Sequence, residues 1–307
     1  MKKVLVATDK PFAKIALEQI RAIVEEAGYQ LALLEKYTTP QQLLDAVVDA
    51  NAMIVRSDLI TKEVVEAAKE LKIVVRAGAG YDNLDLAACS AAKVVAMNTP
   101  GQNANAVAEL VFGMVVSMVR NGYNGTSGTE LRGKSIGIHA YGNVGYYVAK
   151  IAKGFGMEVY AFDPFVSKEK MMADGVTPVN TVEELYKTCQ YVSLHIPATE
   201  TTKKSINYNL LSLMPKGAML INTARKEVIH EDELVKLMDE RADFRYVSDI
   251  EPGNKQVFAD KFGGRFFFTP KKMGAQTEEA NINAGVAAAR QIVSFFKTGD
   301  ETFRVNK

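Results

Sequence analysis

Short apolar runs alternate with helical patterns along this chain, and this alternation limits its fold more than any other feature. A helical pattern such as Ile15–Ala27 carries its apolar residues on one face and is followed by Gly28 as a stop. Thr39-Pro40 likewise predicts a helix start before Gln41–Val48. Apolar strands separated by helices form parallel sheets with right-handed crossovers. The runs of the first third are Val4–Ala7, Leu31–Leu34, Ala52–Val55, Ile73–Val75 and Val94–Met97.

The same alternation starts again in the middle of the chain, so we expect an α/β protein with two doubly wound parallel-sheet domains. A length of 307 residues fits two domains. The helix Asn105–Arg120 is apolar over most of its surface and is expected to be buried, and Glu278–Lys297 is a second long helix. Asn121–Gly128 has the composition of a linker. The later strands are expected at Ser135–His139, Met157–Phe162, Tyr191–Leu194, Ala218–Asn222, Phe244–Ser248 and Phe266–Phe268.

Charge and composition exclude several classes of partner. Lys plus Arg number 37 and Asp plus Glu 36, so no net field favours nucleic acid or an anionic membrane. No apolar run approaches the roughly 20 residues that span a bilayer, and the first residues lack a signal-peptide pattern. Cys89 and Cys189 form neither a disulfide framework nor a metal motif. We therefore expect a cytoplasmic protein with no metal site.

A glycine-rich turn follows the strand Ser135–His139 and opens the helix Tyr146–Lys153. Its sequence is Ala140-Tyr141-Gly142-Asn143-Val144-Gly145. This is the fingerprint of a dinucleotide-binding fold with alanine in place of the first glycine. Gly142 allows the pyrophosphate to approach, Gly145 allows close helix packing, and the helix N-terminus attracts the phosphates. The alanine is compatible with the turn only if its φ stays negative.

An acidic residue at the expected distance supports the same interpretation. Asp163 follows the strand Met157–Phe162 and lies eighteen residues after Gly145. A carboxylate in this position accepts hydrogen bonds from the adenosine ribose and repels a 2′-phosphate. The pattern therefore predicts NAD rather than NADP as the cofactor.

Several motifs together resemble the D-2-hydroxyacid dehydrogenase family, in order and over nearly the whole chain. Two of them, Ile54-Val55-Arg56-Ser57 and Met97–Asn103, resemble its phosphoglycerate dehydrogenase branch. The other segments are Arg76–Asp85, Leu131–Ile138, the glycine-rich turn, Phe162-Asp163-Pro164, Val192–Pro197 and Ile221–Arg225.

The resemblance implies the arrangement of the domains. It implies a flavodoxin-like substrate domain from residues 1–98 and 275–307, with a Rossmann NAD-binding domain of residues 99–274 inserted in it. It further implies hinges near Asn98–Gly101 and Lys272–Gln276, a catalytic cleft, and a homodimer formed through Asn105–Arg120. The chain length matches short relatives without a serine-sensing domain, so serine feedback is not expected.

The resemblance also implies a set of cofactor-binding residues. Within it, Asp249 binds the nicotinamide carboxamide and His195 lies near the adenosine. The full set is Tyr141, Gly142, Asn143, Val144, Gly145, Asp163, Pro164, His195, Ile196, Pro197, Thr223, Ala224, Asp249 and Gly274.

A second implied set binds the substrate and carries out the reaction. Arg225 matches the arginine whose planar guanidinium holds the carboxylate and carbonyl oxygens of a 2-hydroxy or 2-keto acid. Glu251 matches the acid that orients the proton-transfer residue. The other implied substrate contacts are the phosphate anchors Arg56 and Ser57, the N–H groups of Gly78 and Ala79, and Asn103.

The proton-transfer position departs from the family pattern. Where the family has Pro-His-x-Gly, this chain has Pro270-Lys271-Lys272-Met273-Gly274. Counting back from Gly274 places Lys272 at the histidine position, and counting forward from Pro270 selects Lys271. We favour Lys272. A lysine at this position resembles the pattern of one subgroup of phosphoglycerate dehydrogenases. A lysine near its usual pKa of about 10.4 donates protons well, whereas accepting one in alcohol oxidation requires a lowered pKa.

Three functions agree with these residues. The first is NAD-dependent oxidation of D-3-phosphoglycerate toward serine. The second is the same chemistry on another small acid such as glycerate, lactate or hydroxypyruvate, for which Arg56 would have no phosphate to bind. The third is a non-enzymatic NAD sensor, against which the retained Arg225, Asp249 and Asp163 argue.

Overall fold

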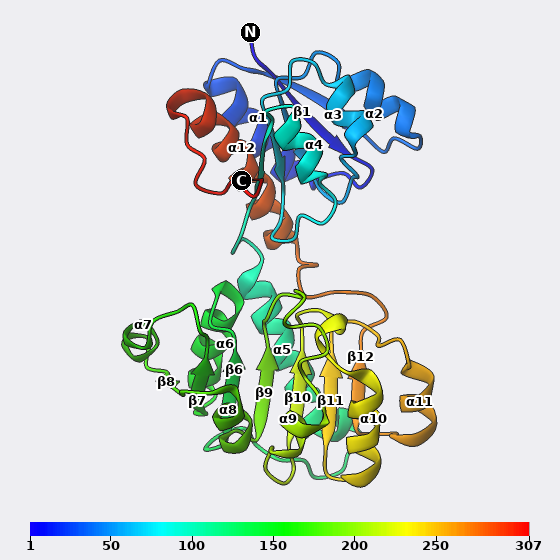
Figure 1. Cartoon of the computed structure of the whole chain (residues 1–307), viewed down its shortest axis with the longest axis vertical. Helices are drawn as coiled ribbons and strands as arrows, with labels where there is room; N and C mark the ends of the chain where they lie inside the picture. The colour runs from blue at the N-terminus through cyan, green and yellow to red at the C-terminus, as the bar shows by residue number, and fades with distance from the viewer. Residues whose placement is uncertain (307) are drawn as a thin grey trace. The chain divides into compact units, whose positions relative to one another are not determined.

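A computed structural model describes residues 1–306 and divides them into two compact units (Figure 1). Unit 1 consists of Met1–Asn103 together with the segment that begins at Gln276, and unit 2 is the continuous segment Ala104–Ala275. Of the boundaries expected from the sequence, 98/99 lies five residues before the first of these and 274/275 lies one residue before the second.

Unit 1 contains a five-stranded parallel sheet of order β2-β1-β3-β4-β5. Each strand begins and ends within one residue of the run expected from the sequence, because a strand covered on both faces is apolar along its length. The elements are β1 (Lys3–Thr8), α1 (Lys14–Glu26), β2 (Gln30–Glu35), α2 (Pro40–Ala46), β3 (Ala52–Val55), α3 (Lys62–Ala67), β4 (Ile73–Arg76), α4 (Leu86–Ala91), β5 (Val95–Asn98) and α12 (Glu278–Thr298).

Helices cover both faces of this sheet. On one face α1 packs against α12, as Figure 1 shows, and both pack on a core that includes Val6, Ile54 and Val75. On the other face α2, α3 and α4 follow one another over Met53 and Val74. The C-terminal helix therefore completes the first unit, as expected from the sequence.

Unit 2 contains a seven-stranded parallel sheet of order β12-β11-β10-β9-β6-β7-β8. The expected α/β class with two parallel sheets is thus confirmed. The elements are α5 (Ala104–Val119), β6 (Ser135–His139), α6 (Asn143–Gly154), β7 (Glu158–Phe162), α7 (Lys168–Ala173), β8 (Thr177–Pro178), α8 (Val182–Thr188), β9 (Tyr191–Leu194), α9 (Tyr208–Ser212), β10 (Met219–Asn222), α10 (Glu231–Glu240), β11 (Arg245–Ser248), α11 (Lys255–Lys261) and β12 (Phe266–Phe268), with 3₁₀ turns at Asn121–Tyr123 and Lys226–Val228.

Two hydrophobic cores lie on the two faces of the second sheet. One contains α5 and α6, which pack against each other. The other contains α8, α9 and α10. The glycine-rich stretch Asn121–Gly128 does not join the two units, contrary to its linker-like composition. It lies within unit 2, where Thr129 N–H donates to Val119 O at 2.9 Å and closes the loop back onto α5.

Parallel strands bring the loops that follow them to one edge of the sheet. In unit 2 the chain proceeds outward from β6 to β7 and β8, and then returns to β9 on the other side of β6. Such a reversal leaves a crevice beyond the carboxyl ends of the two central strands, where open α/β sheets bind ligands. All the cofactor-binding residues expected from the sequence belong to this unit.

Candidate active site

The turn after β6 has the shape of a phosphate-binding loop. Gly142 is the N-cap of α6, no side chain of residues 1–306 caps this helix, and a Cβ on Gly142 would meet open space. A Cβ on Gly145 would lie 2.4 Å from Ala140 O, so only glycine allows this close approach. The uncapped N–H groups and open space suit a diphosphate.

Ala140 corrects one expectation from the sequence. Its φ is +80°, in the left-handed region, whereas a negative φ was expected for an alanine in this turn. The turn keeps the conformation that the usual glycine would adopt, and the methyl group makes that conformation unfavourable by about 1–2 kcal/mol. The geometry of the turn therefore prevails over the preference of the residue.

Asp163 ties this loop to the end of β7. Its Oδ2 accepts a hydrogen bond from Tyr141 N–H at 2.7 Å, and its Oδ1 accepts one from Phe165 N–H at 2.8 Å. The adjoining Pro164 is exposed, as is Phe165 with 95% of its surface accessible. The carboxylate thus lies beside the glycine-rich turn, where the sequence predicts a ribose site.

Two histidines lie at the adjoining ends of β6 and β9. His139 Nδ1 lies 3.3 Å from the Tyr186 hydroxyl, and His195 Nε2 lies 3.0 Å from Ser193 Oγ. Burial lowers the pKa of His139 to about 4 and that of His195 to about 3. Both imidazoles are therefore neutral near pH 7. Ile196 and Pro197 continue the loop from His195.

The loop after β10 carries Arg225. Asn222 shapes it, because its Oδ1 accepts from Ala224 N–H at 2.9 Å and its Nδ2 donates to Arg225 O at 3.0 Å. The Thr223 hydroxyl is buried and has no hydrogen-bond partner among the described residues. An unsatisfied buried hydroxyl suits a polar ligand group, since leaving it unpaired costs about 1–3 kcal/mol.

Lys272 reaches the same loop from the segment after β12. Its Nζ donates to Ala224 O at 2.8 Å and to Thr223 O at 3.1 Å. Arg225 Nη1 donates to the same Ala224 oxygen at 3.1 Å. The basic side chains of Lys272 and Arg225 therefore meet at one carbonyl oxygen.

The buried carboxylate of Asp249, just after β11, is the third acceptor for Lys272. Oδ1 lies 3.1 Å from Nζ, and Oδ2 accepts a hydrogen bond from Gly274 N–H at 2.9 Å. Burial lowers the pKa of Lys272 below its ordinary value, and Asp249 partly opposes that effect. A Cβ on Gly274 would lie 2.8 Å from Asp249 Oδ2, which explains the glycine.

Neither Glu251 nor Lys271 joins this cluster. Glu251 Oε2 forms an ion pair with Lys255 Nζ at 2.6 Å, and the expected pairing with the proton-transfer residue is not present in this structure. Lys271 is exposed, and only its backbone O is engaged, by the Thr269 hydroxyl. The two lysines that the sequence left as alternatives therefore differ in their surroundings.

The predicted substrate anchors Arg56 and Ser57 follow β3 in unit 1. Arg56 Nη1 donates to Lys10 O at 2.8 Å and Pro11 O at 3.1 Å, and its Nη2 donates to Asn281 Oδ1 at 2.7 Å. Ser57 is exposed. The guanidinium is thus held by protein oxygens in this structure.

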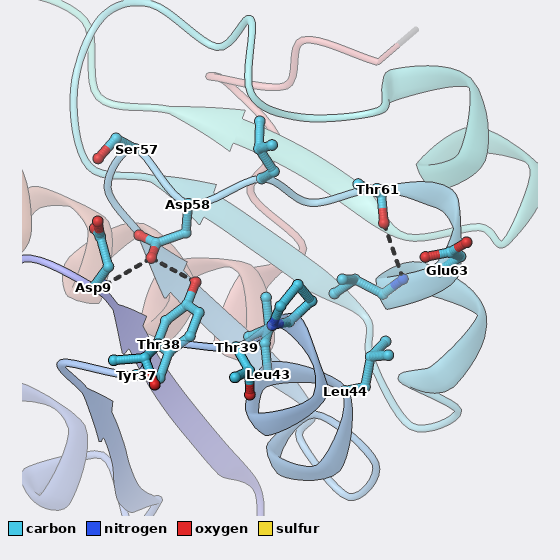
Figure 2. A pocket seen from close by; sticks show the side chains of 13 residues that line it. Asp9, Tyr37, Thr38, Thr39, Leu43, Leu44, Ser57, Asp58, Thr61 and Glu63 are labelled. Carbon is cyan, nitrogen blue, oxygen red and sulfur yellow. Dashed lines mark hydrogen bonds between the residues drawn. The ribbon is translucent and has the colours of Figure 1, made fainter.

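Asp58, which the sequence analysis did not single out, organises this loop. Its Oδ1 accepts from the Tyr37 hydroxyl at 2.6 Å and from Asp9 N–H at 2.8 Å, and Figure 2 draws both of these bonds. Its Oδ2 accepts from Arg56 N–H at 3.2 Å. Asp58 lines a pocket of about 460 Å³ together with Asp9, Tyr37 and Ser57. No spacing signal marks Asp58, because its partners come from three separate loops.

The Gly78–Ala79 turn lies after β4. Gly78 has φ +150°, and a Cβ there would overlap the Arg76 guanidinium, 1.4 Å from Nη1. Gly78 N–H donates to Arg76 O at 2.9 Å, and Ala79 is exposed. Asn103 is the last residue of the first segment of unit 1.

Neither a metal site nor a membrane-spanning helix is present among residues 1–306. No group of three or more His, Cys, Asp or Glu residues is placed to hold a metal ion. In the same residues, every helix is too short or too polar to span a membrane.

Comparisons with known proteins agree with this geometry. Residues 111–257 match the family model described as "D-isomer specific 2-hydroxyacid dehydrogenase, NAD binding domain". The chain is similar to the NAD⁺-bound 3-phosphoglycerate dehydrogenase of Entamoeba histolytica, with 48% identity and a TM-score of 0.88 over 100% of this chain and 99% of that one.

Two curated relatives are more distant. The D-3-phosphoglycerate dehydrogenase of Methanocaldococcus jannaschii is 35% identical over 273 residues, which are 83% of this chain and 51% of the relative. The hydroxypyruvate reductase of Thermotoga maritima is 29% identical over 280 residues, 86% of this chain and 90% of the relative. The chain thus spans about half the length of the curated phosphoglycerate dehydrogenases that it matches.

Proposed function

Because this chain belongs to the D-2-hydroxyacid dehydrogenase family, we propose that it is a cytoplasmic enzyme that oxidises D-3-phosphoglycerate to 3-phosphohydroxypyruvate with NAD, in the direction of serine synthesis. The meeting of Lys272 Nζ and Arg225 Nη1 on Ala224 O carries the proposal, because a 2-hydroxy acid requires both a proton acceptor and a carboxylate-binding cation. The likeness to the Entamoeba enzyme supports the choice of substrate.

The residues of unit 2 fit the expected cofactor. Gly142, Asn143, Val144 and Gly145 would hold its diphosphate at the uncapped end of α6, and Asp163 would bind the adenosine ribose. The Thr223 hydroxyl, which has no hydrogen-bond partner among residues 1–306, and the Asp249 carboxylate would bind the nicotinamide end of the cofactor. NAD, when bound, accepts the hydride that leaves C2 of the substrate.

Lys272 and Arg225 divide the remaining chemistry. In the oxidation, neutral Lys272 takes the hydroxyl proton as the C2–H bond breaks and the carbonyl forms, and in the reverse reaction its ammonium returns that proton. Arg225 holds the carboxylate through its planar donors. Burial favours the neutral amine that oxidation needs, and the remaining proton affinity places the pH optimum above that of a histidine enzyme.

A spectrophotometric assay tests this proposal. NADH formation is followed at several pH values with D-3-phosphoglycerate, D-glycerate and D-lactate, using wild type, Lys272→Ala, Lys271→Ala and Arg56→Ala. We expect turnover only with the phosphorylated acid, a loss of at least about 100-fold in kcat for Lys272→Ala, and little change for Lys271→Ala. An optimum at acid pH, or activity indifferent to Lys272, would contradict the assignment.

One observation favours a second substrate class. The Arg56 guanidinium already donates to three protein oxygens, as a structural arginine would. If Arg56→Ala leaves turnover unchanged and an unphosphorylated acid is used best, the enzyme is a dehydrogenase for glycerate, lactate or hydroxypyruvate. NAD binding without turnover of any acid would instead indicate a sensor.

We also propose a homodimer formed through α5. The helix is covered by its own unit along most of its length, and Leu110 and Val116 stay partly exposed. Light scattering coupled to size-exclusion chromatography measures the molar mass of the protein in solution. A mass near 33.6 kDa, that of one chain, would contradict a dimer.

A further inference from the structure

The three hydrogen atoms of the Lys272 ammonium face three protein acceptors. These are the carbonyl oxygens of Thr223 and Ala224 and the carboxylate of Asp249. Of the three, only the carboxylate is charged. It therefore determines how strongly this position favours a protonated amine, since hydrogen bonds between ionised groups are about twice as strong as neutral ones.

Asp249 is itself rigidly held. Its side chain is fully buried, and Gly274 N–H donates to Oδ2 at 2.9 Å while Oδ1 faces the amine at 3.1 Å. One carboxylate thus fixes two points of the segment that carries Lys272. A buried carboxylate without a cation would be costly, so Asp249 and Lys272 stabilise each other.

Glu251 is engaged elsewhere. It lies four residues before Lys255 in the chain and pairs with it at 2.6 Å, at the start of α11. Its side chain is about one third exposed, in contrast to the fully buried Asp249. The acid that resemblance assigns to orienting the proton-transfer residue is therefore committed to a surface ion pair.

We propose that Asp249, and not Glu251, is the carboxylate that positions Lys272 and controls its protonation in this chain. The catalytic part of this inference rests on the proposed dehydrogenase function. In the oxidation the hydroxyl proton of the substrate would move to Lys272 Nζ, beside Asp249 Oδ1, and the C2 hydride would go to NAD. Asp249 is a positioning residue for Lys272 in addition to any contact it makes with the cofactor.

Four charged or titratable groups face Lys272 from the surrounding elements. Asp249 after β11 and Glu227 in the 3₁₀ turn favour the ammonium, whereas Arg225 after β10 disfavours it. The His195 imidazole after β9 is close enough to interact with the amine and is neutral near pH 7. Removing Asp249 leaves Arg225 and Glu227, which act on the amine in opposite directions, and takes away the one carboxylate hydrogen-bonded to it, so the amine should lose its proton at lower pH.

Kinetics across pH provide the first test. In wild type, kcat for oxidation should rise with pH as Lys272 becomes neutral. In Asp249→Asn this rise should occur about 1–3 pH units lower, the usual effect of losing a nearby opposite charge. Glu251→Gln should leave the pH at which kcat rises unchanged. Weaker cofactor binding alone would raise the KM for NAD and leave the pH profile in place.

Amine labelling gives a second readout that does not depend on turnover. The rate at which acetic anhydride modifies Lys272 in the intact protein without substrate reports its neutral fraction, and Lys271 in the same peptide serves as an internal reference. Each pH unit by which the pKa falls should raise that rate about tenfold below the pKa. We expect the increase in Asp249→Asn and none in Glu251→Gln.

The outcomes separate this inference from the proposed function. If wild type turns over no 2-hydroxy acid, the proposed function fails, while labelling still measures the coupling of Asp249 to Lys272. If Glu251→Gln shifts the profile or the labelling and Asp249→Asn does not, the inference is overturned. A uniform loss of rate in Asp249→Asn, with unchanged labelling, would also overturn it. Circular dichroism checks folding, and Asp249→Ser replaces Asp249→Asn in both measurements if that variant does not fold.

Discussion

At the scale of single residues, Ala140 keeps a backbone conformation that suits glycine. Its φ of +80° costs an alanine about 1–2 kcal/mol. Ala140→Gly removes that cost. It also makes the unfolded chain more flexible, which lowers the free energy of unfolding by about 0.4–1 kcal/mol. We therefore expect a net stabilisation of about 0.5–1 kcal/mol in urea unfolding of the full-length chain.

A matched variant shows whether the backbone is responsible. Ala173→Gly, at the exposed end of α7, makes the same chemical change in a helical conformation. It should destabilise by up to about 1 kcal/mol. If both variants shift the unfolding midpoint in the same direction, the strain assigned to Ala140 is absent.

Asp163 connects stability of the turn with the choice of cofactor. Because its oxygens accept from Tyr141 N–H and Phe165 N–H, the carboxylate is fixed beside the expected ribose. Asp163→Asn removes the charge that repels a 2′-phosphate and weakens the bonds to the ribose. We expect the ratio of kcat/KM for NAD to that for NADP to fall at least about tenfold, equivalent to about 1.4 kcal/mol.

Asp174 supplies the control for this comparison. It also contacts the turn, since its Oδ2 accepts from the Tyr141 hydroxyl at 3.2 Å, but it has no predicted ribose contact. Asp174→Asn should leave the cofactor ratio within a factor of two or so. An unchanged ratio in Asp163→Asn would show that another residue selects NAD.

At the scale of secondary-structure elements, the paired ends of β6 and β9 make unit 2 sensitive to acid. Burial lowers the pKa of His139 to about 4 and of His195 to about 3, compared with 6.5 for an unhindered imidazole. Below pH 6.5 these two imidazoles therefore bind protons in the unfolded chain but not in the folded chain. Stability should be constant above that pH and decrease steadily from pH 6.5 toward pH 4.

Histidine variants measure this effect. Both histidine residues are partly accessible to solvent, so screening reduces the expected loss to about 1–2 kcal/mol per histidine at pH 4.5. His139→Asn should flatten the decrease between pH 6.5 and 4 in denaturant titrations, whereas His230→Asn, at the N-cap of α10, should not. If the free energy of unfolding decreases equally steeply in wild type and in both variants, the acid sensitivity comes from carboxylates.

Elements also show how far the sequence could predict this molecule. Buried strands such as β3 and β9 were predictable to the residue, because both of their faces need apolar side chains. The two-residue β8 and the five-residue α9 are too short to produce a periodic pattern. Spacing also makes Lys272 rather than Lys271 the proton-transfer candidate, since Gly274 fixes the count in the motif, and that role stays a prediction.

Side-chain partners were less predictable than positions. The ion pair of Glu251 with Lys255 has a helical spacing of four residues, but that of Asp249 with Lys272 joins residues 23 apart. The partners of Asp58 likewise come from different loops. Such contacts depend on how strands are ordered in the sheet, and no local pattern records that order.

At the scale of the whole molecule, the chain is organised as one continuous unit inserted into a discontinuous one. Unit 2 has hydrophobic cores on both faces of its own sheet and runs without interruption from Ala104 to Ala275. A continuous segment with its own core satisfies the requirements for independent folding. We therefore expect the isolated fragment 104–275 to unfold in one cooperative transition.

The same fragment should bind NADH, because every predicted cofactor residue belongs to it. The chain has no tryptophan, so emission of the reduced nicotinamide itself reports binding. Saturation at 100 times Kd should stabilise the fragment by about 2.7 kcal/mol.

Two alanine variants on α6 test where the cofactor binds. Gly145→Ala should abolish binding, since its Cβ would lie 2.4 Å from Ala140 O. Gly154→Ala, with open space around it on the same helix, should bind NADH normally. If the fragment folds and binds NADH equally well with either substitution, the cofactor does not bind at the α6 turn. A fragment that does not fold would instead show that unit 2 depends on unit 1 for its stability.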